Sequence, residues 1–163
     1  MILIVADTGP INYLIQIGHI AVLEKLVEKV VLPASVHAEL LSDAAPSVVK
    51  AWTEEPPSWV EVRSANQPVV ENGISAADGE AIALAQELSA AFLLMDDSRA
   101  RRCASRLGVA IMGTLGLLEE AAARGLIPLE PALEKLRATS FYLTDELIEA
   151  MLRRDTERRF RSP

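Results

Sequence analysis

Short runs of uninterrupted apolar residues alternate along the chain with longer segments whose apolar residues recur at helical spacing. A weaker strand is predicted at 58–62, where Ser58 and Glu61 interrupt the apolar residues, and the short apolar runs predict strands at 2–6, 29–33, 91–95 and 108–112. They lack the polar alternation of a half-solvated strand, which indicates burial on both faces, as in a parallel sheet covered by helices. The longer segments predict helices at 10–17, 19–28, 34–43, 46–55, 76–90, 97–107, 114–124, 130–138 and 144–154. This order predicts a three-layer α/β/α sandwich with a central, mainly parallel sheet.

The breaks between these segments indicate one compact domain. Pro56 and Pro57 end a helix, and residues 64–75 form a polar loop with a turn at Asn72-Gly73. A chain of 163 residues is long enough to bury a core without disulfides or a structural metal. We expect residues 1–127 to form the main domain, 128–154 a helical pair packed on it, and 155–163 a flexible tail.

Cysteine content and hydropathy narrow the class of protein. Cys103 is the only cysteine, which excludes an intramolecular disulfide and a cysteine-rich zinc site. The start of the chain, "MILIVADTGP", lacks the basic and long apolar regions of a signal peptide. The longest apolar runs are too short to span a bilayer. We therefore expect a cytoplasmic protein with no membrane partner.

The net charge of −7 hides an uneven distribution. Residues 1–98 carry 4 basic and 14 acidic side chains, whereas residues 99–163 carry 12 basic and 9 acidic ones. An acidic half beside an arginine-rich half suits a metal site with a phosphate-binding rim. Ordinary scatter with a basic tail explains the same counts, so charge alone leaves both interpretations open.

Carboxylates stand where two predicted strands end. Asp7 follows the first strand, and Asp96 and Asp97 follow the strand at 91–95. Ligands of parallel α/β sheets bind outside the carboxyl ends of the strands, so these side chains converge if the two strands are neighbours. Glu39 and Asp78 can join them from helices, with Glu80 close by. Each acid also has a purely structural interpretation.

Helix capping is the main structural alternative for these acids. Asp7 precedes a helix start at Thr8-Gly9-Pro10, and Ser75 and Asp78 have capping-box spacing. Asp96, Asp97 or Ser98 can cap the next helix, and Glu39 can be solvated. Taken together, however, so many carboxylates at one crevice repel one another unless a cation or protonation neutralises them. Ligand sets made only of oxygen favour Mg²⁺ or Mn²⁺.

Several catalytic motifs are missing from the sequence. It contains no P-loop, no dinucleotide-binding G-x-G-x-x-G after the first strand, and no G-x-S-x-G nucleophile elbow. Cys103 lies within a predicted helix without a paired base. Metal-assisted phosphoryl chemistry is the class that remains.

Four segments resemble the PIN domain, the nuclease fold of VapC-type toxins. They are "IVADTGPINYLI" (4–15), "VLPASVHAEL" (31–40), "ISAADGEAIALA" (74–85) and "FLLMDDSRARRCASRLGVAIMGTLGLLEEAAARGLI" (92–127). The DDxxAR and GTLGLL elements of the last segment resemble one subgroup found in prokaryotic toxin–antitoxin pairs. The resemblance makes residues 1–127 a PIN-like nuclease domain, and the helical pair beyond also fits the subgroup.

The resemblance implies a set of site residues. By position, the catalytic acids are Asp7, Glu39, Asp78 and Asp97. The metal ligands are Asp7, Asp78 and Asp97, with Asp96 and Glu80 as competitors for the last two positions. Thr8 would orient Asp7 or a bound water.

The resemblance further implies a Mg²⁺- or Mn²⁺-dependent ribonuclease. It would be the toxin of a type II pair, a homodimer restrained by an antitoxin protein, with Arg99 and Arg102 contacting RNA. Those arginines have a solvated helix face as their structural alternative. A PIN nuclease in RNA processing without an antitoxin, and a PIN-like protein that binds nucleic acid without cutting, stay open as alternatives. At 4% aromatic residues, we expect no base-stacking platform.

Overall fold

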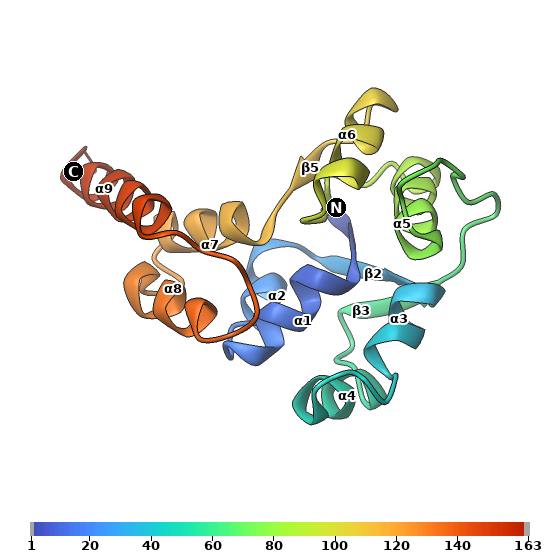
Figure 1. The fold of residues 1–163 in the computed structure, drawn as a ribbon, viewed down its shortest axis with the longest axis horizontal. Coiled ribbons are helices and arrows are strands. Elements are labelled where there is room, and N and C mark those ends of the chain that lie inside the picture. The colour runs from blue at the N-terminus through green and yellow to red at the C-terminus, as the bar shows by residue number, and fades with distance from the viewer. Residues whose placement is uncertain (1, 162–163) are drawn as a thin grey trace.

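Five parallel strands form one sheet in the computed structural model, which describes residues 2–161 (Figure 1). The strands are β1 (Leu3–Ala6), β2 (Lys29–Pro33), β3 (Val60–Arg63), β4 (Leu93–Leu94) and β5 (Ile111–Met112). Their order across the sheet is β3-β2-β1-β4-β5, and each neighbouring pair is parallel. The predicted strands are all present, although β4 and β5 are shorter than expected. β1 lies in the centre, and its Ala6 pairs with Leu94 of β4.

Helices connect the strands as the periodicity predicts, with shifted ends. They are α1 (Thr8–Gln16), α2 (Val22–Leu26), α3 (Ala34–Leu40), α4 (Ser47–Glu54), α5 (Ala76–Glu87), α6 (Ser98–Arg106), α7 (Thr114–Ala123), α8 (Leu129–Arg137) and α9 (Asp145–Arg161). α1 begins at Thr8 rather than at residue 10. Pro10 is tolerated in the first turn because the backbone N–H groups there have no hydrogen-bond acceptor within the helix, so the missing N–H of proline costs no hydrogen bond.

Two apolar clusters cover the two faces of the sheet and make the expected three layers. Alternate residues of β1 point to opposite faces. Val5 packs with Leu93 against α5 and α6, and Ile4 belongs to the cluster that contains Leu14 of α1 and Leu118 of α7. All of these side chains are buried. The carboxyl ends of β1 and β4 therefore meet at one edge, with helices of both layers beginning there.

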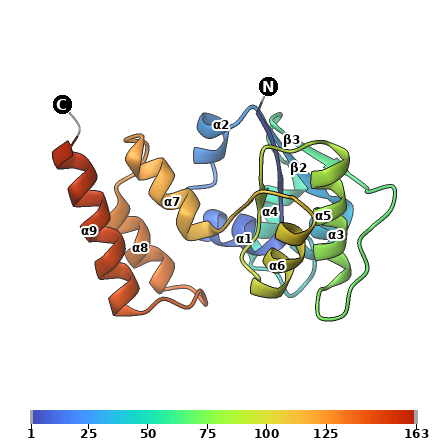
Figure 2. The same cartoon turned by 90° about the horizontal axis from the view of Figure 1, so that it is seen from above.

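The helical pair α8 and α9 packs on α7 and extends away from the sheet (Figures 1 and 2). The expectation of a flexible tail from Asp155 is wrong for the described residues, since α9 continues to Arg161. Asp155 is buried and pairs with Arg158 at 3.2 Å and Arg159 at 2.8 Å, which joins the last two turns of the helix. Residues 162–163 of the expected tail lie outside the described residues.

Among residues 2–161, no helix has both the length and the apolar character that crossing a membrane requires.

Candidate functional site

Asp7 is the most unusual carboxylate of the protein. It follows β1 and precedes α1, but its side chain makes no capping hydrogen bond, so capping does not explain it. The side chain is 7% exposed, and its Oδ1 is buried without a hydrogen-bond partner among residues 2–161. Burial, followed by repulsion from Asp78, raises the pKa of Asp7 to about 8. At neutral pH and without a cation, Asp7 therefore holds a proton.

Asp78 and Glu39 are the acids that act on Asp7. Both contribute repulsion that raises the pKa of Asp7, and Asp78 also shares a side-chain hydrogen bond with it. Asp78 forms the expected capping box as well: it accepts from the Ser75 backbone N–H at 3.3 Å, and the Ser75 hydroxyl accepts from the Asp78 N–H at 3.0 Å. Asp78 thus caps α5 and also belongs to the acidic group around Asp7.

Thr8 donates its hydroxyl proton to Glu39 rather than to Asp7. The first half of the expectation, that the Thr8 hydroxyl orients Asp7, therefore gains no support from this geometry, and its role toward a bound water stays a prediction. Glu39 is exposed on α3, and the Thr8 hydroxyl fixes it beside the start of α1. The interpretation of Glu39 as a merely solvated side chain does not account for this contact.

The paired aspartates after β4 have different environments. Asp96 is half-buried and accepts from the Thr114 backbone N–H at 2.8 Å and from the Thr114 hydroxyl at 2.6 Å. A Cβ placed on Gly9 would be 3.7 Å from Asp96 Oδ2, so this carboxylate lies against the start of α1. Asp97 is exposed and caps α6 by accepting from the Ala100 N–H at 2.9 Å. The sequence-based preference for Asp97 over Asp96 thus gains no support from this geometry.

Glu80 does not belong to the acidic group. Its Oε1 accepts from the Ser35 N–H at 2.9 Å and the Ser35 hydroxyl at 2.7 Å, and its Oε2 accepts from the Ala65 N–H at 3.4 Å. Burial alone would raise the pKa of Glu80, but these hydrogen bonds outweigh it and lower the pKa. Glu80 lies two residues beyond Asp78 on α5 and its carboxylate faces Ser35 and Ala65, so its expected role as a metal ligand gains no support from this geometry.

The acids of residues 2–161 do not form a ready set of three ligands around one point. The reason is visible in their partners: Glu39, Asp78, Asp96 and Asp97 each accept from a neighbouring hydroxyl or N–H. Asp7 alone has a buried oxygen with no donor. Hydrogen bonds and one proton thus relieve the repulsion. The orphan oxygen beside Asp78 still suits Mg²⁺, which needs only one or two protein carboxylates and keeps several waters.

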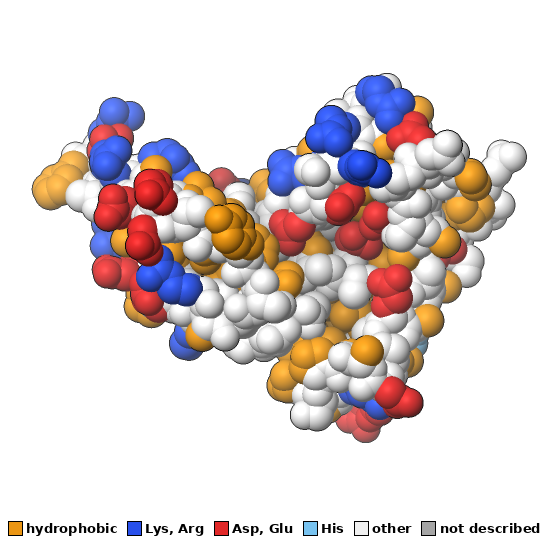
Figure 3. Space-filling model, viewed as in Figure 1, with side chains coloured by type: hydrophobic (Ala, Val, Ile, Leu, Met, Phe, Trp, Pro, Cys, Tyr) orange, Lys and Arg blue, Asp and Glu red, His pale blue; other side chains and the backbone are white. Residues whose placement is uncertain are grey.

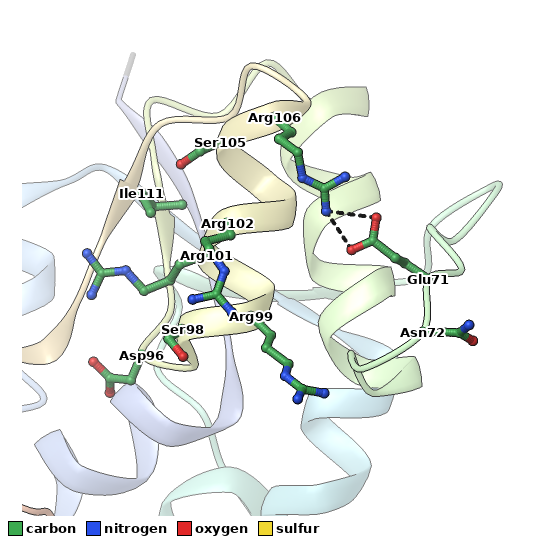
Figure 4. Close-up of a pocket in the computed structure, with 10 residues that line it drawn as sticks. All are labelled: Glu71, Asn72, Asp96, Ser98, Arg99, Arg101, Arg102, Ser105, Arg106 and Ile111. Carbon is green, nitrogen blue, oxygen red and sulfur yellow. Dashed lines mark hydrogen bonds and ion pairs between the residues drawn. The ribbon is translucent and has the colours of Figure 1, made fainter.

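An arginine-lined cavity of about 700 Å³ adjoins Asp96 (Figure 4). Arg99, Arg101, Arg102 and Arg106 of α6 line it, together with the loop residues Glu71 and Asn72. Arg106 is neutralised by Glu71, with both carboxylate oxygens within 2.8 Å. The Arg99 guanidinium lies over Gly73, where a Cβ would come within 2.8 Å of Nη1. The two arginines expected to contact RNA, Arg99 and Arg102, therefore face the same cavity.

Acidic side chains and arginines meet on one face of the molecule (Figure 3). The acids gather at the base of a notch between the lobe of α7–α9 and the lobe of α5 and α6, and the arginines stand on its upper rim. This arrangement matches an acidic centre with a phosphate-binding rim.

The sequence analysis assigned no role to Thr114 or to Gly113. Thr114 is completely buried, starts α7 and holds both oxygens of Asp96. A signal was present, since Gly113 and Thr114 directly follow the strand at 108–112 and therefore reach the same edge of the sheet as Asp7 and Asp96.

Comparison with known proteins agrees with this fold. A sequence profile of the family DUF3368, described as a PIN domain, matches residues 3–157. Among solved structures, a PilT N-terminus domain protein, SSO1118 from the hyperthermophilic archaeon Sulfolobus solfataricus P2, is similar, with a TM-score of 0.50 and 19% identity. The match covers 88% of this chain and 100% of that one. No curated protein matches the chain.

Proposed function

Because the chain belongs to the PIN-domain family, whose members are generally nucleases, we propose that it is a Mg²⁺-dependent endoribonuclease. The observation that carries the proposal is the state of Asp7. A carboxyl group with a raised pKa, an orphan oxygen and two acidic neighbours has no structural use here. It is a site prepared for a cation that replaces the proton.

Asp7 and Asp78 would hold the ion, with Asp96 and Asp97 at the neighbouring strand end to complete its surroundings. Mg²⁺ or Mn²⁺ bound there stabilises negative charge on the phosphate and lowers the pKa of water. Glu39, fixed by Thr8, stands at the exposed side, where it can accept a proton from an attacking water. Thr114 keeps Asp96 directed toward the start of α1.

Arg99 and Arg102 would bind the phosphates that flank the reacting one. Both are exposed, and neither forms an ion pair within residues 2–161. An unpaired guanidinium can bind a phosphate oxygen with two hydrogen bonds. Their place on α6, which Asp97 caps, puts Arg99 in the first turn after the acids and Arg102 in the second.

The test is cleavage of a labelled RNA pool with Mg²⁺, Mn²⁺ or EDTA. Asp7→Asn and Asp78→Asn should each lower the rate by at least about 100-fold, because each removes a ligand charge without a change of shape. Asp43→Asn is the matched control, since Asp43 is fully exposed and pairs only with Lys50. Cleavage that survives EDTA or the Asp7 substitution would refute the proposal. Metal-dependent RNA binding without cleavage would instead support a binding protein.

The finer role proposed is that of a toxin in a type II pair, working as a homodimer. It rests on the resemblance of residues 92–127 to the toxin subgroup. Expression of the protein should arrest growth, Asp7→Asn should abolish the arrest, and a protein encoded by the adjacent gene should relieve it. Light scattering should give twice the mass of 17.7 kDa. Activity without growth arrest would favour an enzyme of RNA processing.

A further inference from the structure

A second cavity, of about 420 Å³, extends from Asp96 toward α7 and the loop between α8 and α9. Its floor consists of half-buried apolar side chains from β5 and α7, namely Ile111, Met112 and Leu115. Tyr142 stands at its edge with 83% of its surface exposed. A flat apolar ligand bound here could contact the apolar floor with one side and the exposed aromatic ring with another.

The loop that carries Tyr142 is anchored to α1 by the two residues that directly precede the tyrosine. Phe141 packs edge-on against Tyr13 of α1, with ring centroids 5.1 Å apart and planes at 87°. The Tyr13 hydroxyl and the Ser140 hydroxyl lie 3.0 Å apart and share a hydrogen bond. Phe141 is thus half-buried against the core, whereas Tyr142 next to it is exposed. Fixing Tyr142 in advance lowers the entropy lost when a ligand stacks on it.

Arg101 connects this cavity with the arginine-lined cavity of α6. Asp96, Arg101 and Ile111 line both cavities. The Arg101 guanidinium lies close over Gly113, where a Cβ would come within 2.8 Å of Nη1, and it forms no ion pair among the residues that the structure describes. Figure 4 shows Arg101 directed away from Arg99 and above Asp96. Cationic groups therefore continue past the acids toward Tyr142.

We propose that Tyr142 is a stacking platform for the base of an unpaired RNA nucleotide, whose phosphate is bound by Arg101. The inference rests on the proposed function and adds the path of the bound RNA to it. The RNA strand would run from Arg99 and Arg102, past the acids, to Tyr142. The proposal departs from the expectation of no base-stacking platform, which rested on the low aromatic content, because a single well-placed ring is enough for one base. A base can lie on the ring only if it is unpaired, so the substrate class is single-stranded RNA or a loop.

A protein surface is a poorer fit for this place. The unpaired guanidinium groups of Arg99, Arg101 and Arg102 line the path, and the apolar floor is the size of a small ligand site, not of a protein interface. A single strand of RNA supplies both a phosphate for Arg101 and a flat apolar face for Tyr142.

Binding and cleavage are measured separately to test this contact. Binding uses a fluorescein-labelled single-stranded RNA of mixed sequence, and the same strand in a duplex, in EDTA so that no cleavage occurs. Tyr142→Ala should weaken binding of the single strand about tenfold, and Tyr142→Trp should keep it. Binding of the duplex should be weak and should not change. The RNA carries 2-aminopurine at successive positions, and its fluorescence should be quenched at one position by the native protein but not by Tyr142→Ala.

Phe160→Ala is the matched control, because Phe160 is 85% exposed near the end of α9 and lines neither of the two cavities. It should bind like the native protein. Equal affinity of Tyr142→Ala and the native protein, or equal quenching, would overturn the stacking contact, even if the protein cleaves RNA in Mg²⁺. Failure of the native protein to cleave any RNA would overturn the proposed nuclease, whereas a loss of binding confined to Tyr142→Ala would still support the platform. Unchanged melting temperatures confirm that the variants are folded.

Discussion

The protonated state of Asp7 predicts that the stability of the metal-free protein falls as the pH rises. The pKa of this carboxyl is about 8 in the folded protein, against 3.8 for an unperturbed aspartate. Between these values the folded state binds a proton that the unfolded state has lost. The free energy of unfolding therefore decreases with pH across this window, in contrast to the usual behaviour of a paired carboxylate.

The size of the effect follows from the same numbers. Each pH unit inside the window changes the free energy of unfolding by about 1.4 kcal/mol for one group. The interval from pH 5 to pH 7 lies wholly inside the window, so the loss from Asp7 is about 3 kcal/mol. For a protein of this length, that corresponds to a melting temperature lower by roughly 6–10 °C.

The measurement is a series of thermal melts in EDTA from pH 5 to pH 7, for the native protein and for Asp7→Asn. The substitution keeps the shape of the side chain and removes its titration, so the difference between the two melting temperatures should grow with pH in favour of the variant. His19 has a pKa lowered by burial, and its titration acts in the opposite direction, but it is present in both proteins and cancels in the difference. Asp43→Asn should follow the native curve.

Mg²⁺ should change this pH dependence. An ion that replaces the proton of Asp7 binds more tightly as the pH rises, so millimolar Mg²⁺ should raise the melting temperature more at pH 7 than at pH 5. It should have little effect on Asp7→Asn at either pH. Parallel curves for the native protein and Asp7→Asn in EDTA would refute the raised pKa, and with it the argument that a cation replaces a proton here.

Three contacts give further predictions that are checked by urea unfolding. Thr114→Val keeps the volume of a buried side chain but removes the hydroxyl that donates to Asp96 at 2.6 Å, so the free energy of unfolding should fall by about 2 kcal/mol. RNA cleavage should also slow. An unchanged stability and an unchanged cleavage rate would show that Thr114 does not hold the carboxylate of Asp96. Gly79→Ala should lower the free energy of unfolding by about 2 kcal/mol or more, because the new Cβ would lie 2.0 Å from the Val69 carbonyl oxygen. This loss should occur although alanine is the better helix former by about 1 kcal/mol. A stabilised variant would contradict the close packing of Gly79 on Val69. Glu80→Ala should cost about 1 kcal/mol at pH 7 through its lost hydrogen bonds to Ser35. Because the pKa of Glu80 is lowered, that difference should be complete above the ordinary value of 4.5 and disappear as the pH falls through the folded value.

The sequence by itself determined the fold class and the edge of the sheet at which the site lies. Apolar runs without alternation required strands with both faces covered, and the structure has the five strands and both layers of helices. The carboxylates that follow β1 and β4 are likewise readable, since a residue just beyond a strand end needs no tertiary information to be assigned to that edge. These signals are local, and short-range periodicity records them.

Helix ends were harder to predict where local rules competed. Residues 155–161 carry many charges and read as a tail, yet α9 continues through them. Asp155 is buried and neutralised by Arg158 and Arg159 of the same helix, so the segment supplies its own counterions. The sequence did carry a signal for this helix, since Arg158 and Arg159 follow Asp155 by three and four residues, the spacing at which helical side chains are neighbours.

Only the tertiary structure decided what each acid does. Whether Asp96 or Asp97 turns toward α1, whether Thr8 meets Asp7 or Glu39, and whether Glu80 joins the group depend on partners dozens of residues away in the chain. The raised pKa of Asp7 depends in the same way on burial and on the nearness of Asp78 and Glu39. The proximity of Tyr142 to Arg101 depends on how α8 and α9 pack on α7. Such contacts arise from the packing of whole elements, which side-chain periodicity within one element does not encode.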